Sequence, residues 1–242
     1  MLLLYFNGWF AKNILMPLVT QRMVAIACVL LLPLVTVVYG NYWVNDNSML
    51  RVWSFTTWCW LLPAIPFLWW QHTLRLPDVA TFTARLWKPF VIGVAFGIAD
   101  VLIIKGILHP QPYDSLPPFL QPFPYSIFLY TAGAIEVELY YRLIPLGLAL
   151  WGIQKWVHTR WQTFVFSLIA VLTALREPLE QWPDGVWWFV CYAFGSGFLM
   201  NLIQAMYFKN QGFWATLLLR LGHYSIWHIA LGLYVQYVEL AR

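Results

Sequence analysis

Two carboxylates and one guanidinium lie in an otherwise apolar stretch that is predicted to be helical, residues 134–142 (AIEVELYYR). Residues four apart share a helical face, so Glu138 and Arg142 are expected to form an ion pair or to bind one ligand. Glu136 lies about 200° around the helix from Glu138 and needs partners on another helix. Because one arginine does not easily neutralise two carboxylates, one carboxyl group needs further partners or a proton, which makes it a candidate acid or base. The alternative is a structural ion pair that orders the protein core.

A second set of polar and aromatic side chains follows one face of the last apolar segment. Its members recur at the helical spacing i, i+3, i+4, i+7 and i+8: Arg220, His223, Tyr224, Trp227 and His228. This spacing predicts a stripe that faces the bundle interior, either as part of a functional pocket or as interhelical hydrogen bonds. His223 and His228 are five residues apart rather than four, so the pair does not indicate a metal site, and the sequence identifies no cofactor.

Two further pairs are candidates for the lining of the same pocket. Arg176 and Glu177 precede Pro178, which is expected to end the fifth apolar helix and to leave both charges near water. An ordinary ion pair at a membrane interface is the alternative. Asn201 and Gln204 lie one helical turn apart in the sixth apolar segment and are predicted to face one cavity.

The third apolar segment carries one acidic and one basic residue, Asp100 and Lys105. They are too far apart around a helix to pair directly. Lys105 is expected to extend outward to the membrane surface. Asp100 is expected to contact the side chains that line the pocket rather than a ligand itself.

The elements that position these residues are predicted from composition to be membrane helices. Of the 242 residues, 61% are hydrophobic and only 10% are charged, whereas a soluble domain has about 25% charged residues. Apolar runs long enough to cross a hydrocarbon core of about 30 Å recur along the chain. They predict one all-α integral membrane domain, residues 1–242, with about seven crossings. The expected spans are Met23–Tyr39, Val52–Trp70, Pro89–Leu108, Tyr125–Trp151, Phe164–Leu175, Val186–Phe208 and Phe213–Tyr237.

The flanking segments predict the orientation. Residues 1–22 are expected to form an interfacial helix rather than a cleaved signal peptide. The proline-rich linker 109–124 is expected to be a stiff cover over the outer face. Lys and Arg on one side of the predicted spans place the N-terminus in the cytoplasm and the C-terminus outside. The same rule accounts for the net charge of +4, so nucleic acid is not an expected partner, whereas membrane lipids are.

Segment 137–142 (VELYYR) resembles a motif of the CaaX-protease and bacteriocin-processing family of intramembrane proteases, also called the Abi family. It matches the second Glu and the Arg of Glu-Glu-x-x-x-Arg, with Val137 in the place of the first Glu. The resemblance covers residues 125–237, including the segments 194–197 and 211–214 that resemble the penultimate helix and a glycine-containing turn. It implies a bundle of membrane helices, in a bacterial inner membrane, that cleaves a membrane-associated peptide or protein.

Two arginines depart from this family pattern. Arg176 stands at the histidine position of Phe-x-x-x-His, and Arg220 at that of His-x-x-x-Asn/Asp. The resemblance implies that Glu138 is the general base, Arg142 its orienting partner and His223 the remaining group to polarise water or substrate. Arginine is not deprotonated in proteins, so neither replacement supplies a metal ligand or a proton shuttle.

Two functional hypotheses follow. A peptidase requires Glu138, Arg142 and His223 to converge around a space that holds water. A non-catalytic relative, or pseudoenzyme, would use the same helices to bind or assemble with a membrane-protein partner, and its polar cluster would be closed by Arg–Glu pairs. A small transporter or lipid-binding protein would need a pathway to both faces, and the sequence has no inverted repeats in its support.

Overall fold

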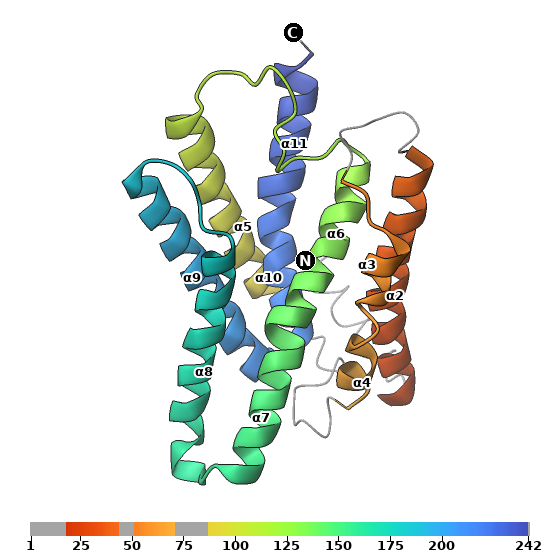
Figure 1. Ribbon diagram of the computed structural model, residues 1–242, viewed down its shortest axis with the longest axis vertical. Coiled ribbons are helices and arrows are strands. Elements are labelled where there is room, and N and C mark those ends of the chain that lie inside the picture. The colour runs from red at the N-terminus through yellow and green to blue at the C-terminus, as the bar shows by residue number, and fades with distance from the viewer. Residues whose placement is uncertain (1–17, 44–50, 71–86, 242) are drawn as a thin grey trace, which may run out of the picture.

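The computed structural model describes residues 18–43, 51–70 and 87–241. The described part of the chain is a bundle of helices without strands (Figure 1), which confirms the predicted all-α class. Four of its helices are long and apolar enough to cross a membrane. They are Arg22–Tyr42, Trp87–Leu108, Thr159–Glu180 and Trp187–Gln211.

Two longer helical paths contain turns of π-helix, in which the hydrogen bonds reach one residue further than in an α-helix. The first runs through α6 (Tyr125–Glu138), η4 (Leu139–Leu143) and α7 (Ile144–Trp156). The second runs through α10 (Phe213–Tyr224), η5 (Ser225–Ala230), α11 (Leu231–Tyr234) and η6 (Val235–Glu239). Such turns are frequent at functional sites, and here η4 follows Glu138 and contains Arg142.

The structure differs from the expected spans in two details. Residues 52–70 do not form one helix but two short ones, α3 (Phe55–Cys59) and α4 (Ala64–Trp69). Pro63, at the start of α4, accounts for this break, because proline donates no backbone hydrogen bond and disfavours helix in the residue before it. The fifth helix, α8 (Thr159–Glu180), is longer than predicted and passes through Pro178. That proline lies in the last turn, so its missing N–H interrupts little of the helix.

The other long helices are α2 (Leu18–Trp43), α5 (Trp87–Ile103) with its π-helical end η3 (Ile104–Leu108), and α9 (Trp187–Gln211). The interfacial helix predicted for residues 1–22 lies outside the described residues up to residue 17, and residues 18–22 belong to α2.

Glycines allow α5 and α10 to touch through their backbones. A Cβ atom on Gly93 would lie 1.8 Å from the carbonyl oxygen of Leu219, and one on Gly222 would lie 2.1 Å from that of Phe90. No side chain fits at such distances, and small residues are the usual means of close packing between membrane helices. This packing positions α5 for the contact between its Asp100 and His223 of α10.

The linker 109–124 crosses the end of the bundle where the C-terminus lies (Figure 1). Tyr113 donates its backbone N–H to the Glu239 carboxylate at 2.9 Å, and the Lys105 ammonium lies 2.8 Å from the same carboxylate. Lys105 therefore pairs with Glu239 of η6, a partner that the sequence did not indicate. Burial of Glu239 opposes its ionisation, but the hydrogen bonds from Lys105 and Tyr113 outweigh burial and hold the pKa below its usual value.

Candidate functional site

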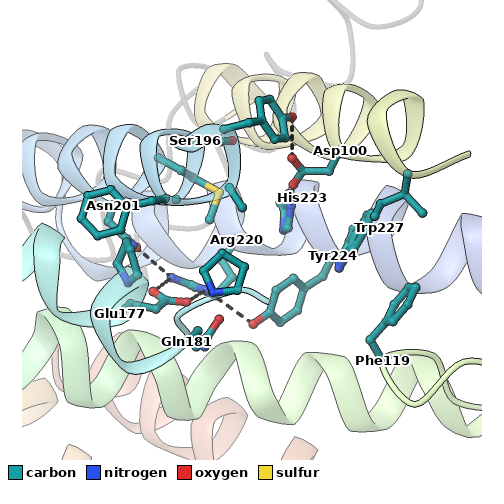
Figure 2. A pocket seen from close by; sticks show the side chains of 18 of the residues that line it. Asp100, Phe119, Glu177, Gln181, Ser196, Asn201, Arg220, His223, Tyr224 and Trp227 are labelled. Carbon is teal, nitrogen blue, oxygen red and sulfur yellow. Dashed lines mark hydrogen bonds and ion pairs between the residues drawn. The ribbon is translucent and has the colours of Figure 1, made fainter. Parts of the chain in front are cut away.

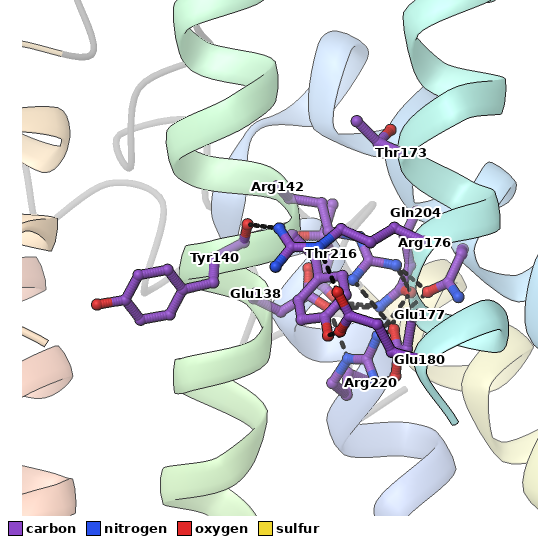
Figure 3. Close-up of polar contacts among 12 residues, drawn as sticks. Glu138, Tyr140, Arg142, Thr173, Arg176, Glu177, Glu180, Gln204, Thr216 and Arg220 are labelled. Atoms are coloured by element: carbon purple, nitrogen blue, oxygen red, sulfur yellow. Dashed lines mark hydrogen bonds and ion pairs between the residues drawn. The ribbon is translucent and has the colours of Figure 1, made fainter. Parts of the chain in front are cut away.

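Arg220 of α10 lies between two carboxylates in the middle of the bundle (Figure 3). Its Nε donates to Glu138 Oε1 at 2.7 Å. Its Nη1 and Nη2 donate to the two oxygens of Glu177 at 2.8 and 2.7 Å, which is a bidentate pair. Glu138 and Arg220 are 0% and 1% exposed. The stripe predicted from the sequence therefore begins with a fully buried ion-pair partner of Glu138.

Arg142 is the second cation of this group. Its Nη1 lies 3.6 Å from Glu138 Oε1 and 3.5 Å from Glu177 Oε2, and its Nη2 donates to the amide oxygens of Asn201 and Gln204. The Gln204 amide nitrogen donates to Glu138 Oε1 at 2.7 Å. The predicted pairing of Glu138 with Arg142 is thus present, but both residues also belong to a larger set.

We call this set the Arg–Glu cluster: Glu138, Arg142, Glu177 and Arg220, with the amides of Asn201 and Gln204. Two positive and two negative charges balance each other in it. All five N–H groups of Arg220 have acceptors. Besides the two carboxylates, these acceptors are the side-chain oxygens of Tyr224, Asn201 and Gln204, at 3.3–3.4 Å. Within the cluster, Glu138 Oε2 is the one side-chain atom that is buried without a hydrogen-bond partner among the described residues. The cluster is therefore closed except at this oxygen.

Arg176 and Glu136 stay outside the cluster. Arg176 pairs with Glu180 at 2.7 Å, and its side chain is 51% exposed. Glu180 also accepts a hydrogen bond from Tyr141. Glu136 is half-buried and forms no hydrogen bond or ion pair with a described residue, so it does not replace Glu138. Of the two arginines at the family's histidine positions, Arg176 and Arg220, only Arg220 reaches the buried cluster.

Glu177, rather than Arg176, enters the cluster because of the phase of α8. The buried face of this helix carries Phe166, Ala170, Ala174 and Glu177, at steps of four, four and three. This helical phase is readable from the sequence and would have placed Glu177 inside and Arg176 outside. The family alignment instead directed attention to Arg176.

His223 forms a second polar layer with α5 and α9, apart from the Arg–Glu cluster. Its Nε2 lies 2.8 Å from Asp100 Oδ2, and the Tyr192 hydroxyl donates to Asp100 Oδ1 at 2.7 Å. His223 Nδ1 is buried without a partner in the described residues. His223 shares no hydrogen bond with Glu138, so the convergence of Glu138, Arg142 and His223 that a peptidase requires is only partly present. Tyr192 had no signal in the sequence.

A cavity of about 340 Å³ lies beside both layers (Figure 2). The stripe Arg220, His223, Tyr224, Trp227 and His228 lines it, together with Asp100, Glu177 and Asn201. His228 is held by a contact of its Nδ1 with the Phe119 carbonyl at 2.9 Å and by stacking on Tyr130. The predicted inward orientation of the stripe is confirmed, and its residues form one wall of this cavity.

The described residues contain no group of three or more His, Cys, Asp or Glu side chains arranged to hold a metal ion. Comparisons of the chain with family models, with curated proteins and with solved structures gave no match.

Proposed function

We propose that the protein is a non-catalytic integral membrane protein whose helical bundle serves as a binding and assembly module, a pseudoenzyme of the CaaX-protease type. The observation that carries this proposal is the place of Arg220. Its guanidinium occupies the space between Glu138 and Glu177 and donates hydrogen bonds to both carboxylates. A general base needs a water or substrate within hydrogen-bond reach, whereas Glu138 is fully buried and its Oε1 serves Arg220 and Gln204.

The proposed membrane placement has seven passes, the second made by α3 and α4. Four helices of sufficient length and apolarity support it. So do the basic residues Lys88, Arg160 and Lys209, which lie near the helix ends opposite the C-terminus. By the positive-inside rule this end faces the cytoplasm, and the family resemblance favours a bacterial inner membrane. Membrane lipids and a second membrane protein are the proposed partners.

A peptidase that uses Glu138 is the competing proposal, and the cavity next to the Arg–Glu cluster is the observation in its favour. In this proposal a peptide would enter the cavity between His223 and Glu177. Arg220 would have to leave Glu138 before water could reach that carboxylate. The two proposals therefore differ in whether Glu138 is needed for cleavage or only for the integrity of the bundle.

New protein N-termini in membranes distinguish these proposals. Membranes that contain the wild type, Glu138→Gln or the exposed control Arg176→Gln are incubated, and new N-termini are identified by mass spectrometry. The binding proposal expects the same N-termini in all three samples. N-termini that disappear with Glu138→Gln but persist with Arg176→Gln would overturn it.

The assembly role has its own test. Photo-crosslinking residues are placed at the exposed positions Val38 of α2, Leu102 of α5 and Leu172 of α8, which are 65%, 64% and 59% exposed. A binding module should give a protein adduct of one defined mass from one of these faces. Adducts with lipid alone from all three faces would refute assembly with a membrane-protein partner.

A further inference from the structure

The cavity beside the Arg–Glu cluster has the size and the lining of a small-molecule site. Its volume of about 340 Å³ lies within the range of about 300–1,000 Å³ that is usual for ligand pockets. Helices α5, α8, α9 and α10 contribute its walls, and Phe119 from the linker also lines it. Gln181 and Pro183, between α8 and α9, place it toward one end of the bundle.

With His223 and His228 neutral, the charges around this cavity do not cancel. Asp100, Glu177 and Arg220 are the formally charged residues of its lining. Arg220 and Glu177 neutralise each other within the Arg–Glu cluster. This leaves the carboxylate of Asp100, whose partner His223 adds a positive charge only when it is protonated. Each Asp100 oxygen receives one hydrogen bond, from Tyr192 or from His223, and the side chain is 22% exposed. A carboxylate oxygen accepts more than one hydrogen bond, so Asp100 retains capacity for a ligand.

Six aromatic residues also line the cavity. They come from three separate parts of the chain: Phe119, Phe189, Tyr192, Phe194, Tyr224 and Trp227. Trp227 stacks on Phe119 with ring centroids 5.2 Å apart. Aromatic faces carry partial negative charge and attract organic cations, an attraction that strengthens when water is excluded.

We propose that this cavity binds an organic ammonium group, with Asp100 as the counter-charge and the aromatic rings as the enclosing wall. An anionic ligand is disfavoured because every N–H of Arg220 already has an acceptor. The ammonium group comes either from a phospholipid headgroup or from a small soluble amine. This inference rests on the proposed binding role, but it does not depend on the identity of a protein partner.

The test uses the purified full-length protein in detergent. Thermal unfolding is followed by tryptophan fluorescence while choline, ethanolamine or the uncharged choline analogue 3,3-dimethylbutanol is added at constant ionic strength. Native mass spectrometry then measures which added phospholipids stay bound, comparing phosphatidylcholine and phosphatidylethanolamine with phosphatidylglycerol. Each measurement is repeated with Asp100→Asn, with Trp227→Leu and with the exposed control Asp114→Asn.

The expected result is binding that depends on the positive charge of the ligand. Either a soluble amine raises the unfolding temperature with saturation, which identifies a soluble source, or only the amine-bearing lipids are retained, which identifies a lipid source. Asp100→Asn should weaken this binding at least tenfold, and Asp114→Asn should leave it unchanged. If Asp100→Asn unfolds, weaker binding by Trp227→Leu serves in its place.

Equal binding of the uncharged analogue or of phosphatidylglycerol, full binding by folded Asp100→Asn, or no binding of any amine would overturn the proposal. These outcomes leave the N-terminus and crosslinking tests of the proposed function unaffected. Conversely, cleavage that depends on Glu138 would overturn the non-catalytic proposal without changing the amine measurements.

Discussion

Removal of Arg220 provides the sharpest test of the idea that the Arg–Glu cluster is a structural unit. Arg220→Met keeps much of the side-chain volume but takes away the bidentate pair with Glu177 and the hydrogen bond to Glu138. Arg142 would then face two carboxylates that are 0% and 7% exposed. Removing one partner of a buried ion pair costs about 3–5 kcal/mol, because a buried charge is left without compensation. The free energy of unfolding should fall by this amount.

The matched control is Arg176→Met, which breaks the ion pair with Glu180 at the same 2.7 Å distance. Its side chain is 51% exposed, so this change should cost only about 0–1 kcal/mol. Unfolding in mixed micelles of increasing SDS content, followed by tryptophan fluorescence, measures both free energies. Equal losses for the two variants would refute the argument, since the cluster would then contribute no more than a surface pair.

A double substitution separates charge balance from the shape of the site. Arg220→Met combined with Glu177→Gln restores the balance of one arginine and one carboxylate. Neighbours in one network couple by about 0.5–3 kcal/mol, so the double variant should lose less stability than the sum of the two single variants. Additive losses would show that the carboxylate and the guanidinium act independently.

Two further predictions concern the scaffold. Gly93→Ala should destabilise the protein by about 1–3 kcal/mol in the same SDS titration, because the new methyl group would clash with the backbone of α10. The control Gly133→Ala should not destabilise it, since no atom lies within 4 Å of the Cβ position of Gly133. Equal effects of the two substitutions would contradict the close contact between α5 and α10. The pKa of Glu239 is lower in the folded protein than in the unfolded chain, where it is about 4.3. Ionised Glu239 should therefore stabilise the fold at pH values above about 4.3, and this contribution should be lost as the pH falls through the folded-state pKa. The stability difference between wild type and Glu239→Gln should therefore shrink on acidification, and a difference independent of pH would refute the ion pair with Lys105.

Local helical spacing predicted the parts of the site that lie on one helix. The pairing of Glu138 with Arg142 and the inward stripe from Arg220 to His228 follow from a period of 3.6 residues. The same rule, applied to the buried face of α8, also places Glu177 inside. At residues 52–70 hydrophobicity predicted a span but not its division into α3 and α4, which follows from Pro63.

Contacts between helices were beyond the reach of the sequence. Asp100 meets His223 because α5 and α10 touch at Gly93 and Gly222, and a pattern within α5 does not reveal which helix it touches. Tyr192 likewise gains its role only from its neighbour Asp100. Pairings of this kind depend on the relative positions of helices that are far apart in the chain.

The two polar layers of α10 differ in what they leave free. Arg220 satisfies all of its donors within the protein, so its charge stabilises the bundle and offers little to a ligand. His223 lies three residues after Arg220, and its partner Asp100 keeps a partly exposed carboxylate in a cavity that aromatic rings help to line. If the protein acts on another molecule, the layer of Asp100 and His223 is therefore the better place for recognition, and the Arg–Glu cluster is the rigid support beneath it.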